Sequence, residues 1–350
     1  MNPTARIGAT HLLDTLMALD VNVTALFAPE HGFRGEAGAG EVIQDGVDQQ
    51  TGLPVYSLYG DIKKPTPGML KNVDLLLFDM QDVGARFYTY NTTLGLLLEA
   101  AAQSDKPVWV LDRPNPAGGE YVAGWTLEEE YESFVGAYPI PMAHGMTLGE
   151  LARMMVGEEW INFDQKPKLR VIPAKNWKRS MKWPQTGLEW YPPSPNLPTF
   201  EHAYIYLGTV LFEGTNISEG RGTEDPFLTI GAPNTALKDA QLSTLRSKYP
   251  MLAIERTSFT PRSIPGKARY PKLEGEQCQG VKIRIKDYNK LDPVTFGVDL
   301  LQVMHKATKD VETTDFIYKL AGSKKVTDFT TRWSESVEAF RQKRAPYLIY

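Results

Sequence analysis

The sequence predicts an α/β protein, with a Rossmann-like, doubly wound and mostly parallel sheet followed by a smaller α+β C-terminal domain. Strand-type and helix-type segments alternate along residues 10–155, as they do in right-handed strand–helix–strand units. The run VDLLLFDM at 73–80 is apolar almost throughout, which is typical of a strand buried on both faces of a parallel sheet. Between 166 and 200 the chain becomes irregular and rich in Pro and Trp. We therefore expect one domain over 1–199 and a second over 200–350.

The elements of the first domain follow from periodicity and from helix-start signals. Strands are expected at 21–28, 51–60, 73–82 and 107–115. Helices are expected at 10–20, 92–104 and 146–155. Thr10 is a suitable N-cap for the first helix, and Thr147 with Glu150 fits a capping box for the last.

The second domain has the same kinds of signal in a different order. A glycine-rich loop covers 213–227, and helices are expected at 236–249, 293–306 and 335–344. Strands are expected at 251–259 and 280–287. The two strands follow one another without an intervening helix, which indicates an α+β arrangement.

Composition excludes several classes of function. The 38 basic and 42 acidic residues give a net charge of −4, which offers no electrostatic basis for a nucleic-acid partner. No run approaches the ~20 apolar residues of a membrane span, and the start of the sequence has no signal-peptide pattern. The single cysteine, Cys278, excludes an internal disulfide, and the five scattered histidines form no HExxH, so we expect no metal.

Cofactor and serine-nucleophile motifs are also missing. The sequence contains no GxxxxGK[ST] phosphate loop, no complete dinucleotide fingerprint and no GxSxG elbow. We therefore expect no cofactor, and carboxylate chemistry is the remaining possibility.

Polar segments follow three expected parallel strands. They are PEHGFRG at 29–35, DMQDVGARFYTY at 79–90 and DRPNP at 112–116. Ligands of open α/β sheets bind beyond the carboxyl ends of the strands, so these segments should meet at one site. Glu30 has the weakest structural explanation of all their polar residues, because an acid directly after Phe-Ala-Pro continues a strand poorly.

Each of the other polar residues has a structural alternative. Asp79, Asp82 or Asp112 can each serve as the N-cap of a following helix. The two arginines of these segments, Arg86 and Arg113, can pair with those carboxylates. His31, next to a glycine, can simply satisfy a turn.

Aromatic residues gather in the expected loops, where a flat ring suits the apolar face of a sugar. As an alternative, each of them can be a lid over the core. They are Phe33, Phe87, Tyr88, Tyr90, Trp125, Tyr138, Trp183, Trp190 and Tyr191.

Seven long motifs stand out along the sequence: LFAPEHGFRG, TGLPVYSLYG, FDMQDVGARFYTY, VLDRPNPAGG, IPMAHGMTLGELA, PSPNLPT and EGTNISEGRGTEDPF. Together they resemble one bacterial family, the NamZ-type exo-β-N-acetylmuramidases of peptidoglycan recycling, formerly a family of unknown function. The resemblance implies a Rossmann-like first domain, an auxiliary second domain and an active-site cleft between them. It implies hydrolysis that releases N-acetylmuramic acid from the non-reducing end of peptidoglycan glycan fragments.

The resemblance also places the family's site residues on this sequence. The acid of the PEHG motif falls on Glu30, with His31 beside it and Arg34 in the same segment. The remaining motif residues fall on Gln81, Asp82, Arg86, Tyr88, Tyr90, Asp112, Arg113, Asn115, His144, Ser194, Asn196, Asn216, Glu219, Arg221 and Thr223. One departure concerns the start, because family members begin with a strand that ends in an N-Q-T-like motif. NPTARIG stands in its place at residue 2, so the first strand is expected to be absent.

Glycoside hydrolysis requires an acid for the leaving oxygen and a second group that supplies or activates the nucleophile. Glu30 is the expected general acid, and Asp82 is the first choice for the second carboxylate, ahead of Asp112 and Glu219. As an alternative, the sugar's 2-acetamido group is the internal nucleophile.

Muramic acid also carries a lactyl carboxylate, which suits a bidentate guanidinium from Arg86, Arg113 or Arg221. The competing function is a non-catalytic module that binds muropeptides. Many family members carry an export signal, so the expected location is periplasmic or extracellular.

Overall fold

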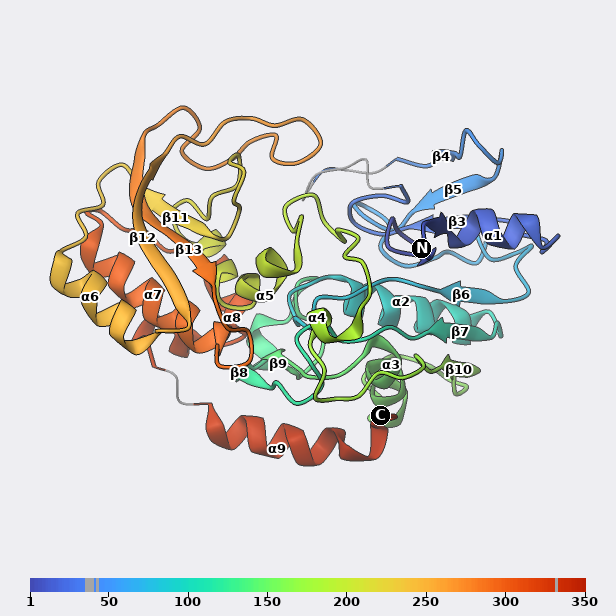
Figure 1. Ribbon diagram of the computed structural model, residues 1–350. Helices are drawn as coiled ribbons and strands as arrows, with labels where there is room; N and C mark the ends of the chain where they lie inside the picture. Colours follow the sequence, from blue (N-terminus) through green and yellow to red (C-terminus); the bar gives the residue numbers. More distant parts are fainter. Residues whose placement is uncertain (35–40, 42–43, 331–332) are drawn as a thin grey trace.

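The computed structural model describes residues 1–34, 41, 44–330 and 333–350, which form two lobes (Figure 1). The strands of the first lobe are β1 (Arg6–Ile7), β2 (Thr10–His11), β3 (Leu26–Ala28), β4 (Gly46–Val47), β5 (Pro54–Ser57), β6 (Leu76–Phe78), β7 (Val108–Leu111), β8 (Ala123–Thr126), β9 (Pro141–Ala143) and β10 (Leu169–Ile172). Its helices are α1 (Leu12–Ala18), α2 (Tyr90–Gln103), α3 (Leu148–Gly157) and α4 (Trp183–Thr186). The rest of the chain forms β11 (Thr229–Ala232), β12 (Leu252–Phe259), β13 (Cys278–Ile285), α5 (Phe200–Thr209), α6 (Asp239–Lys248), α7 (Pro293–Ala307), α8 (Phe316–Ala321) and α9 (Ser334–Arg344).

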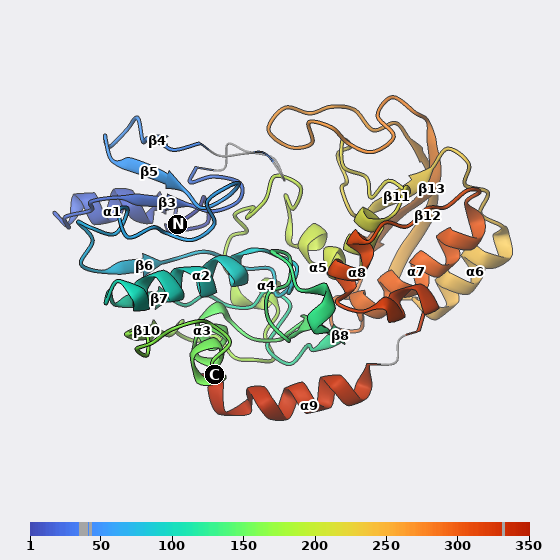
Figure 2. The same ribbon diagram turned by 180° about the vertical axis from the view of Figure 1, so that it is seen from behind.

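Parallel strands form the centre of the first lobe. β7 pairs in parallel with both β6 and β10, with Val108 opposite Leu76 on one side and Leu169 on the other. β3 pairs in parallel with β5, and the short β4 adds to β5 in the antiparallel sense. Helices α2 and α3 contact each other on one face of these strands (Figure 2). The predicted α/β class, with parallel strands and a second C-terminal domain, is confirmed.

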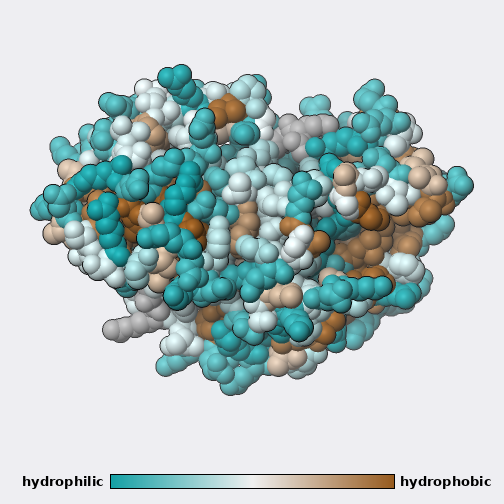
Figure 3. Space-filling model, viewed as in Figure 1, coloured by the Kyte–Doolittle hydropathy of each residue, from teal (hydrophilic) through white to brown (hydrophobic). Residues whose placement is uncertain are grey.

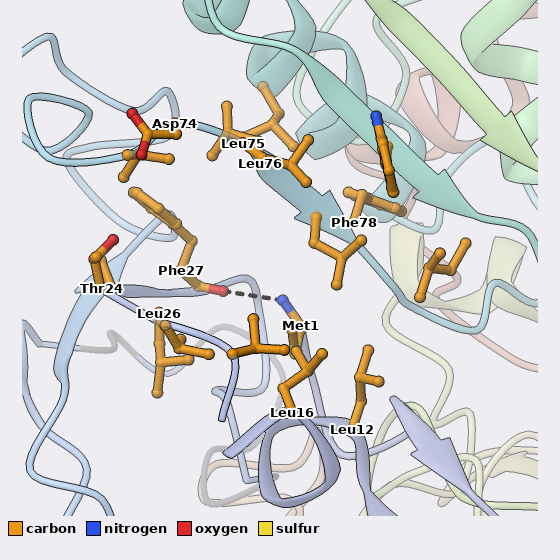
Figure 4. A pocket seen from close by; sticks show the side chains of 18 of the residues that line it. Met1, Leu12, Leu16, Thr24, Leu26, Phe27, Asp74, Leu75, Leu76 and Phe78 are labelled. Atoms are coloured by element: carbon orange, nitrogen blue, oxygen red, sulfur yellow. Dashed lines mark hydrogen bonds between the residues drawn. The ribbon is translucent and has the colours of Figure 1, made fainter. Parts of the chain in front are cut away.

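The parallel strands form two separate pieces, whereas the sequence predicts one continuous sheet. β3 and β6 are edge strands of two three-stranded sheets, and no described segment pairs with both. A groove of ≈ 490 Å³ lies between them, lined mainly by apolar side chains of α1, β3, β6 and α2 (Figures 3 and 4). At one point the Met1 amino group donates to the Phe27 carbonyl oxygen at 3.2 Å.

The hydrophobic core is divided at this groove. The side chains of Leu13, Leu26, Ala28 and Phe33 form a small cluster of their own. The main core begins on the other side, with Leu76 and its neighbours, and continues through both lobes. The segment that carries Glu30 therefore belongs to the smaller cluster.

Helix starts follow the sequence signals with one correction. The capping box of α3 is confirmed, because the Thr147 hydroxyl accepts from the Glu150 N–H and the Glu150 carboxylate accepts from the Thr147 N–H. The N-cap of α1 is His11 rather than Thr10. Its Nδ1 accepts from the Leu13 N–H at 3.2 Å, while Thr10 is held in the pairing of β1 with β2.

The second lobe contains the antiparallel sheet β11–β13–β12, against which α5, α6 and α7 pack. Helices α5 and α7 approach closely at Gly208 and Gly297, where a Cβ on Gly208 would lie 1.9 Å from the Pro293 carbonyl oxygen. The chain ends on the first lobe, where the Arg344 guanidinium donates to the His144 carbonyl oxygen at 3.0 Å (Figure 1). Residues after 333 thus contact the first domain.

Along the part of the chain that the structure describes, no helix is both long and apolar enough to cross a lipid bilayer.

Candidate active site

Glu30 lies just beyond the end of β3, and neighbouring side chains hold its carboxylate. The Thr89 hydroxyl donates to Oε2 at 2.9 Å, and the Tyr59 hydroxyl also hydrogen-bonds the Glu30 carboxylate. Burial raises the pKa of Tyr59 above its usual range, and the negative charge of Glu30 raises it further. Thr89 is the N-cap of α2, so the carboxylate lies at the helix end that favours negative charge.

The backbone around Glu30 is strained and tightly held. His31 is buried and has a φ of 73°, a left-handed conformation that non-glycine residues rarely adopt. The Tyr90 hydroxyl donates to the Pro193 carbonyl oxygen at 3.0 Å and accepts from the Asn2 amide at 2.8 Å. It also lies 3.5 Å from the Glu30 carbonyl oxygen. Tyr90 is fully buried, and its hydroxyl therefore holds the loop that carries the acid from inside the fold.

A small cavity of ≈ 70 Å³ brings residues of both domains to Glu30. Four aromatic rings, from Phe87, Tyr88, Tyr206 and Phe227, form much of its wall. The Tyr206 ring lies edge-on to Phe87 and Phe227, at centroid distances of 5.3 and 4.7 Å. The other lining residues are Glu30, His31, Thr89, Val135, Ser194, Leu197 and Arg221. Glu30 is the only carboxylate among the described residues that line this cavity.

Arg221 is the cation of the cavity. Its Nη2 lies 2.7 Å from Glu213 Oε1, its Nε lies 3.6 Å from Glu219 Oε1, and its guanidinium is 5.1 Å from the centre of the Phe227 ring. Burial acts to lower the pKa of Arg221, but the charges of Glu213 and Glu219 outweigh it and raise the pKa above its usual value. Phe227 has a φ of 67°, so a second strained residue faces this cavity.

Asp82 and His144 form a buried pair beside the site. Asp82 Oδ2 lies 3.4 Å from His144 Nε2 and accepts from the Gly84 N–H at 2.9 Å. His144 Nδ1 accepts from the Met146 N–H, so the ring proton is on Nε2, toward Asp82. Neither side chain is among the described residues that line the cavity. The role of Asp82 as the second carboxylate therefore stays a prediction.

The charge of Asp82 nevertheless reaches the cavity. Burial raises the pKa of Tyr206 well above its usual value, and the charges of Glu213, Glu30 and Asp82 raise it further. Asp82 and Glu30 thus act on the same lining tyrosine.

Arg86 requires a correction, because its side chain has no exposed surface. Its guanidinium donates to the carbonyl oxygens of Trp125 and Ile140 at 2.9 Å each and to that of Leu320 at 2.7 Å. Burial lowers its pKa to about 9. The buried guanidinium joins three segments of the fold and does not reach the cavity.

Two other predicted arginines are engaged in ion pairs away from the cavity. Arg34 forms a bidentate pair with Asp48, with distances of 2.8 and 3.0 Å, and this pair lowers the pKa of Asp48 to about 2. Arg113 pairs with Asp79 in the same way, which is the structural alternative that the sequence left open.

Asp112 has a structural role, although it is not the helix N-cap that the sequence suggested, since Thr147 is the N-cap of α3. Its carboxylate accepts from the Thr147 hydroxyl at 2.6 Å, the Gly149 N–H at 2.8 Å and the Tyr350 hydroxyl at 2.8 Å. Burial raises its pKa to about 6. Asp112 therefore binds the first turn of α3 and the C-terminal residue, outside the cavity.

The remaining predicted residues hold loops in place. Gln81 donates to the carbonyl oxygens of Asp82 and Pro114, each at 2.8 Å, and Asn115 donates to that of Met146. The side chains of Asn196, Asn216 and Thr223 donate to the carbonyl oxygens of Lys267, Asp310 and Gly220 respectively.

Sequence reasoning missed Tyr59, Thr89, Tyr206 and Phe227. Thr89 stands between the two tyrosines of its motif, so the strand-end rule pointed to it. Tyr59 lies inside the strand expected at 51–60 and follows a strand, β5, only in the structure. Tyr206 lies within α5 and gave no signal. Of the aromatic residues singled out, Phe87 and Tyr88 line the cavity, whereas Trp125, Tyr138 and Trp183 are buried in the main core.

Within the described ranges, no group of three or more His, Cys, Asp or Glu side chains is arranged to hold a metal ion.

Comparison with known proteins covers the whole chain. A family model described as exo-β-N-acetylmuramidase NamZ, N-terminal, matches residues 1–201, and its C-terminal counterpart matches residues 204–350. The peptidoglycan β-N-acetylmuramidase NamZ of Bacillus subtilis (strain 168) is 45% identical over 346 residues, covering 95% of this chain and 80% of that protein. Crystal structures of two DUF1343 family proteins from Bacteroides fragilis NCTC 9343 share the fold. Their TM-scores are 0.86 and 0.79, with 34% and 36% identity, and each alignment covers 100% of this chain and 92% of the other.

Proposed function

The chain belongs to the NamZ family of exo-β-N-acetylmuramidases, and from that premise we propose that Glu30 is the general acid of a glycoside hydrolysis in the cavity between its two domains. The protein is a glycosidase of peptidoglycan. The finer proposal is that it releases N-acetylmuramic acid from the non-reducing end of MurNAc–GlcNAc fragments. The observation that carries it is the meeting of Glu30 and Arg221 in one cavity, since the substrate needs both an acid and a receptor for its carboxylate.

Arg221 is the proposed receptor of the lactyl carboxylate. Of the three arginines that the sequence suggested, Arg86 is buried and Arg113 is paired with Asp79. Arg221 is the one that stands among the described lining residues, and 20% of its side chain is exposed. Guanidinium groups bind carboxylates through two parallel hydrogen bonds, which gives orientation as well as attraction. The aromatic wall, with Tyr88 and Tyr206, offers a surface for the apolar face of the sugar ring.

The proposed reaction begins with proton transfer from Glu30 to the glycosidic oxygen as the bond from that oxygen to the anomeric carbon breaks. The carbonyl oxygen of the 2-acetamido group forms a bond to the anomeric carbon in the same step. Water then attacks the anomeric carbon, its proton passes to the Glu30 carboxylate, and the acetamido group is released. Thr89 and Tyr59 hold the carboxylate in place for both proton transfers.

The acetamido route is favoured because Glu30 is the sole carboxylate among the described residues that line the cavity. Asp82 is the alternative, acting with His144 on a water molecule. The two routes differ in outcome, since acetamido assistance retains the anomeric configuration and a base-activated water inverts it. Proton NMR of the first product formed therefore distinguishes them.

The test is turnover of a chromogenic β-N-acetylmuraminide beside the matching β-N-acetylglucosaminide, by wild type, Glu30→Gln and Glu129→Gln. Glu129 is exposed and lies outside the cavity, so it is the matched control. We expect the wild type to prefer the muraminide, Glu30→Gln to lose at least about a hundredfold in kcat, and the control to behave as wild type. Circular dichroism and Tm establish that the variants are folded.

Near-wild-type turnover by folded Glu30→Gln would exclude Glu30 as the acid. Binding of N-acetylmuramic acid by wild type without turnover of either substrate would indicate the non-catalytic alternative. Because the substrate is a cell-wall fragment, we also propose that the reaction takes place in the periplasm or outside the cell.

A further inference from the structure

Lys272 reaches the back of the site from the loop between β12 and β13. Its ammonium donates to the carbonyl oxygens of Phe212, Thr215 and Ile217 at 2.6, 2.9 and 2.7 Å. It also pairs with Glu219 Oε2 at 2.7 Å. The three carbonyl oxygens match the three N–H groups of an ammonium, so the position of the Lys272 head group is fixed, and its contact with Glu219 is an ion pair. Lys272 is not among the described residues that line the cavity.

Glu219 connects Lys272 to Arg221. Only 3% of its side chain is exposed, and one carboxylate oxygen faces each of the two cations. Arg221 in turn pairs with Glu213. The cluster thus holds two carboxylates and two cations, and its formal charges sum to zero. Without Lys272 the sum is −1, at the place where a substrate carboxylate should bind.

We propose that Lys272 is a positioning residue that makes Arg221 available to the carboxylate of the substrate. With the Lys272 ammonium in place, Glu219 Oε2 has a cation 2.7 Å away, and Arg221 Nε lies 3.6 Å from Glu219 Oε1. When the Lys272 ammonium is removed, Arg221 is the sole cation left to the buried Glu219 carboxylate. Glu219 then draws the Arg221 guanidinium toward itself and away from the cavity. The proposal rests on the proposed function of Arg221.

The loop that carries Lys272 supports the same part of the site through its backbone. The Arg262 N–H donates to the Gly222 carbonyl oxygen at 3.0 Å, directly after Arg221. Gly222 has a φ of 81°, and a Cβ there would lie 2.6 Å from the Arg262 carbonyl oxygen, so the turn requires glycine. On the other side, the Asn196 amide donates to the Lys267 carbonyl oxygen at 2.8 Å. One loop therefore braces the Arg221 turn and the segment that carries Ser194.

The experiment compares two substrates that differ only in charge, the chromogenic β-N-acetylmuraminide and its lactyl methyl ester. For Lys272→Met we expect KM of the acid to rise about tenfold or more, with kcat and the KM of the ester changed less than about twofold. Lys272→Arg should recover part of the affinity. Lys282→Met is the matched control, because Lys282 pairs with Asp225 in the same domain and lies outside the cavity.

Charge restoration provides a second measurement. Glu219→Gln combined with Lys272→Met returns the charge of the cluster to zero, and the KM of the acid should return toward the wild-type value. Glu219→Gln alone raises the sum to +1, so the KM of the acid should fall. This variant keeps the proposal testable if Lys272→Met does not fold.

An equal rise in KM for acid and ester, a loss of kcat alone, or no change would each overturn the proposal. Failure of the wild type to cleave either substrate would count against the proposed function instead. In that case the same variants are compared by calorimetric binding of N-acetylmuramic acid and N-acetylglucosamine, and the proposal fails if Lys272→Met weakens both equally.

Discussion

Replacing Asp112 by asparagine should change how the stability of this protein depends on pH. Burial raises the pKa of Asp112 from 3.8 to about 6, although two hydroxyls and two backbone N–H groups donate to its carboxylate. The folded protein therefore keeps this proton in a pH range where the unfolded chain has lost it. Two pKa units correspond to about 3 kcal/mol. The group stabilises the fold fully below pH 3.8, and that stability is lost as the pH rises through 6.

Asparagine does not titrate, so Asp112→Asn removes this dependence while one oxygen remains for the Gly149 N–H. The difference in unfolding free energy, variant minus wild type, should therefore become more positive by about 2.4 kcal/mol between pH 4 and pH 7. Urea unfolding at four pH values, followed by tryptophan fluorescence, measures the difference at each pH. A difference that stays constant from pH 4 to pH 7 would refute the reasoning. Loss of glycosidase activity in a stable variant would return Asp112 to the substrate-binding set.

Two further predictions concern Thr89 and Arg86. Thr89→Val removes the hydroxyl that donates to Glu30, so kcat should fall about tenfold with little change in Tm. The control is Thr93→Val, one turn along α2, which should leave kcat unchanged. Equal effects of the two substitutions on kcat would contradict the role of Thr89. Arg86→Met leaves three carbonyl oxygens without their donor, so the unfolding free energy measured in urea should fall by about 3 kcal/mol or more. A variant as stable as wild type would show that these hydrogen bonds do not contribute to stability.

The sequence predicted the parts of the site that follow local rules. Glu30 and Tyr88 both follow parallel strands, and the carboxyl ends of such strands meet, so their convergence was foreseeable from order alone. The capping box of α3 was equally local. The positions of α2, α3, α6 and α7 followed from periodicity, because burial of one face imposes it. In contrast, β10, β11 and α5 lie in segments where no element was predicted.

The parts that depend on packing between distant segments were not predictable in this way. Arg86 and Arg221 both belong to long polar motifs, yet one is enclosed by carbonyl groups and the other reaches the cavity. The roles of the two arginines can be distinguished only by their tertiary contacts, because the sequence gives the residue type and not what surrounds the guanidinium. Lys272 lies more than fifty residues from its carbonyl partners and has no motif around it. The division of the parallel strands into two pieces likewise depends on which segments pair.

The divided core has a consequence for how the activity responds to stress. Residues packed around Leu13 and Leu26 form an apolar cluster separate from the main core, so we expect them to open at a lower free energy than the main core does. Glu30 stands on that part, whereas Arg221 and the aromatic wall stand on the other. As urea or temperature rises, catalysis should therefore cease before the bulk of the fluorescence and circular dichroism signal changes. In that range the enzyme should be inactive while its main core is still folded.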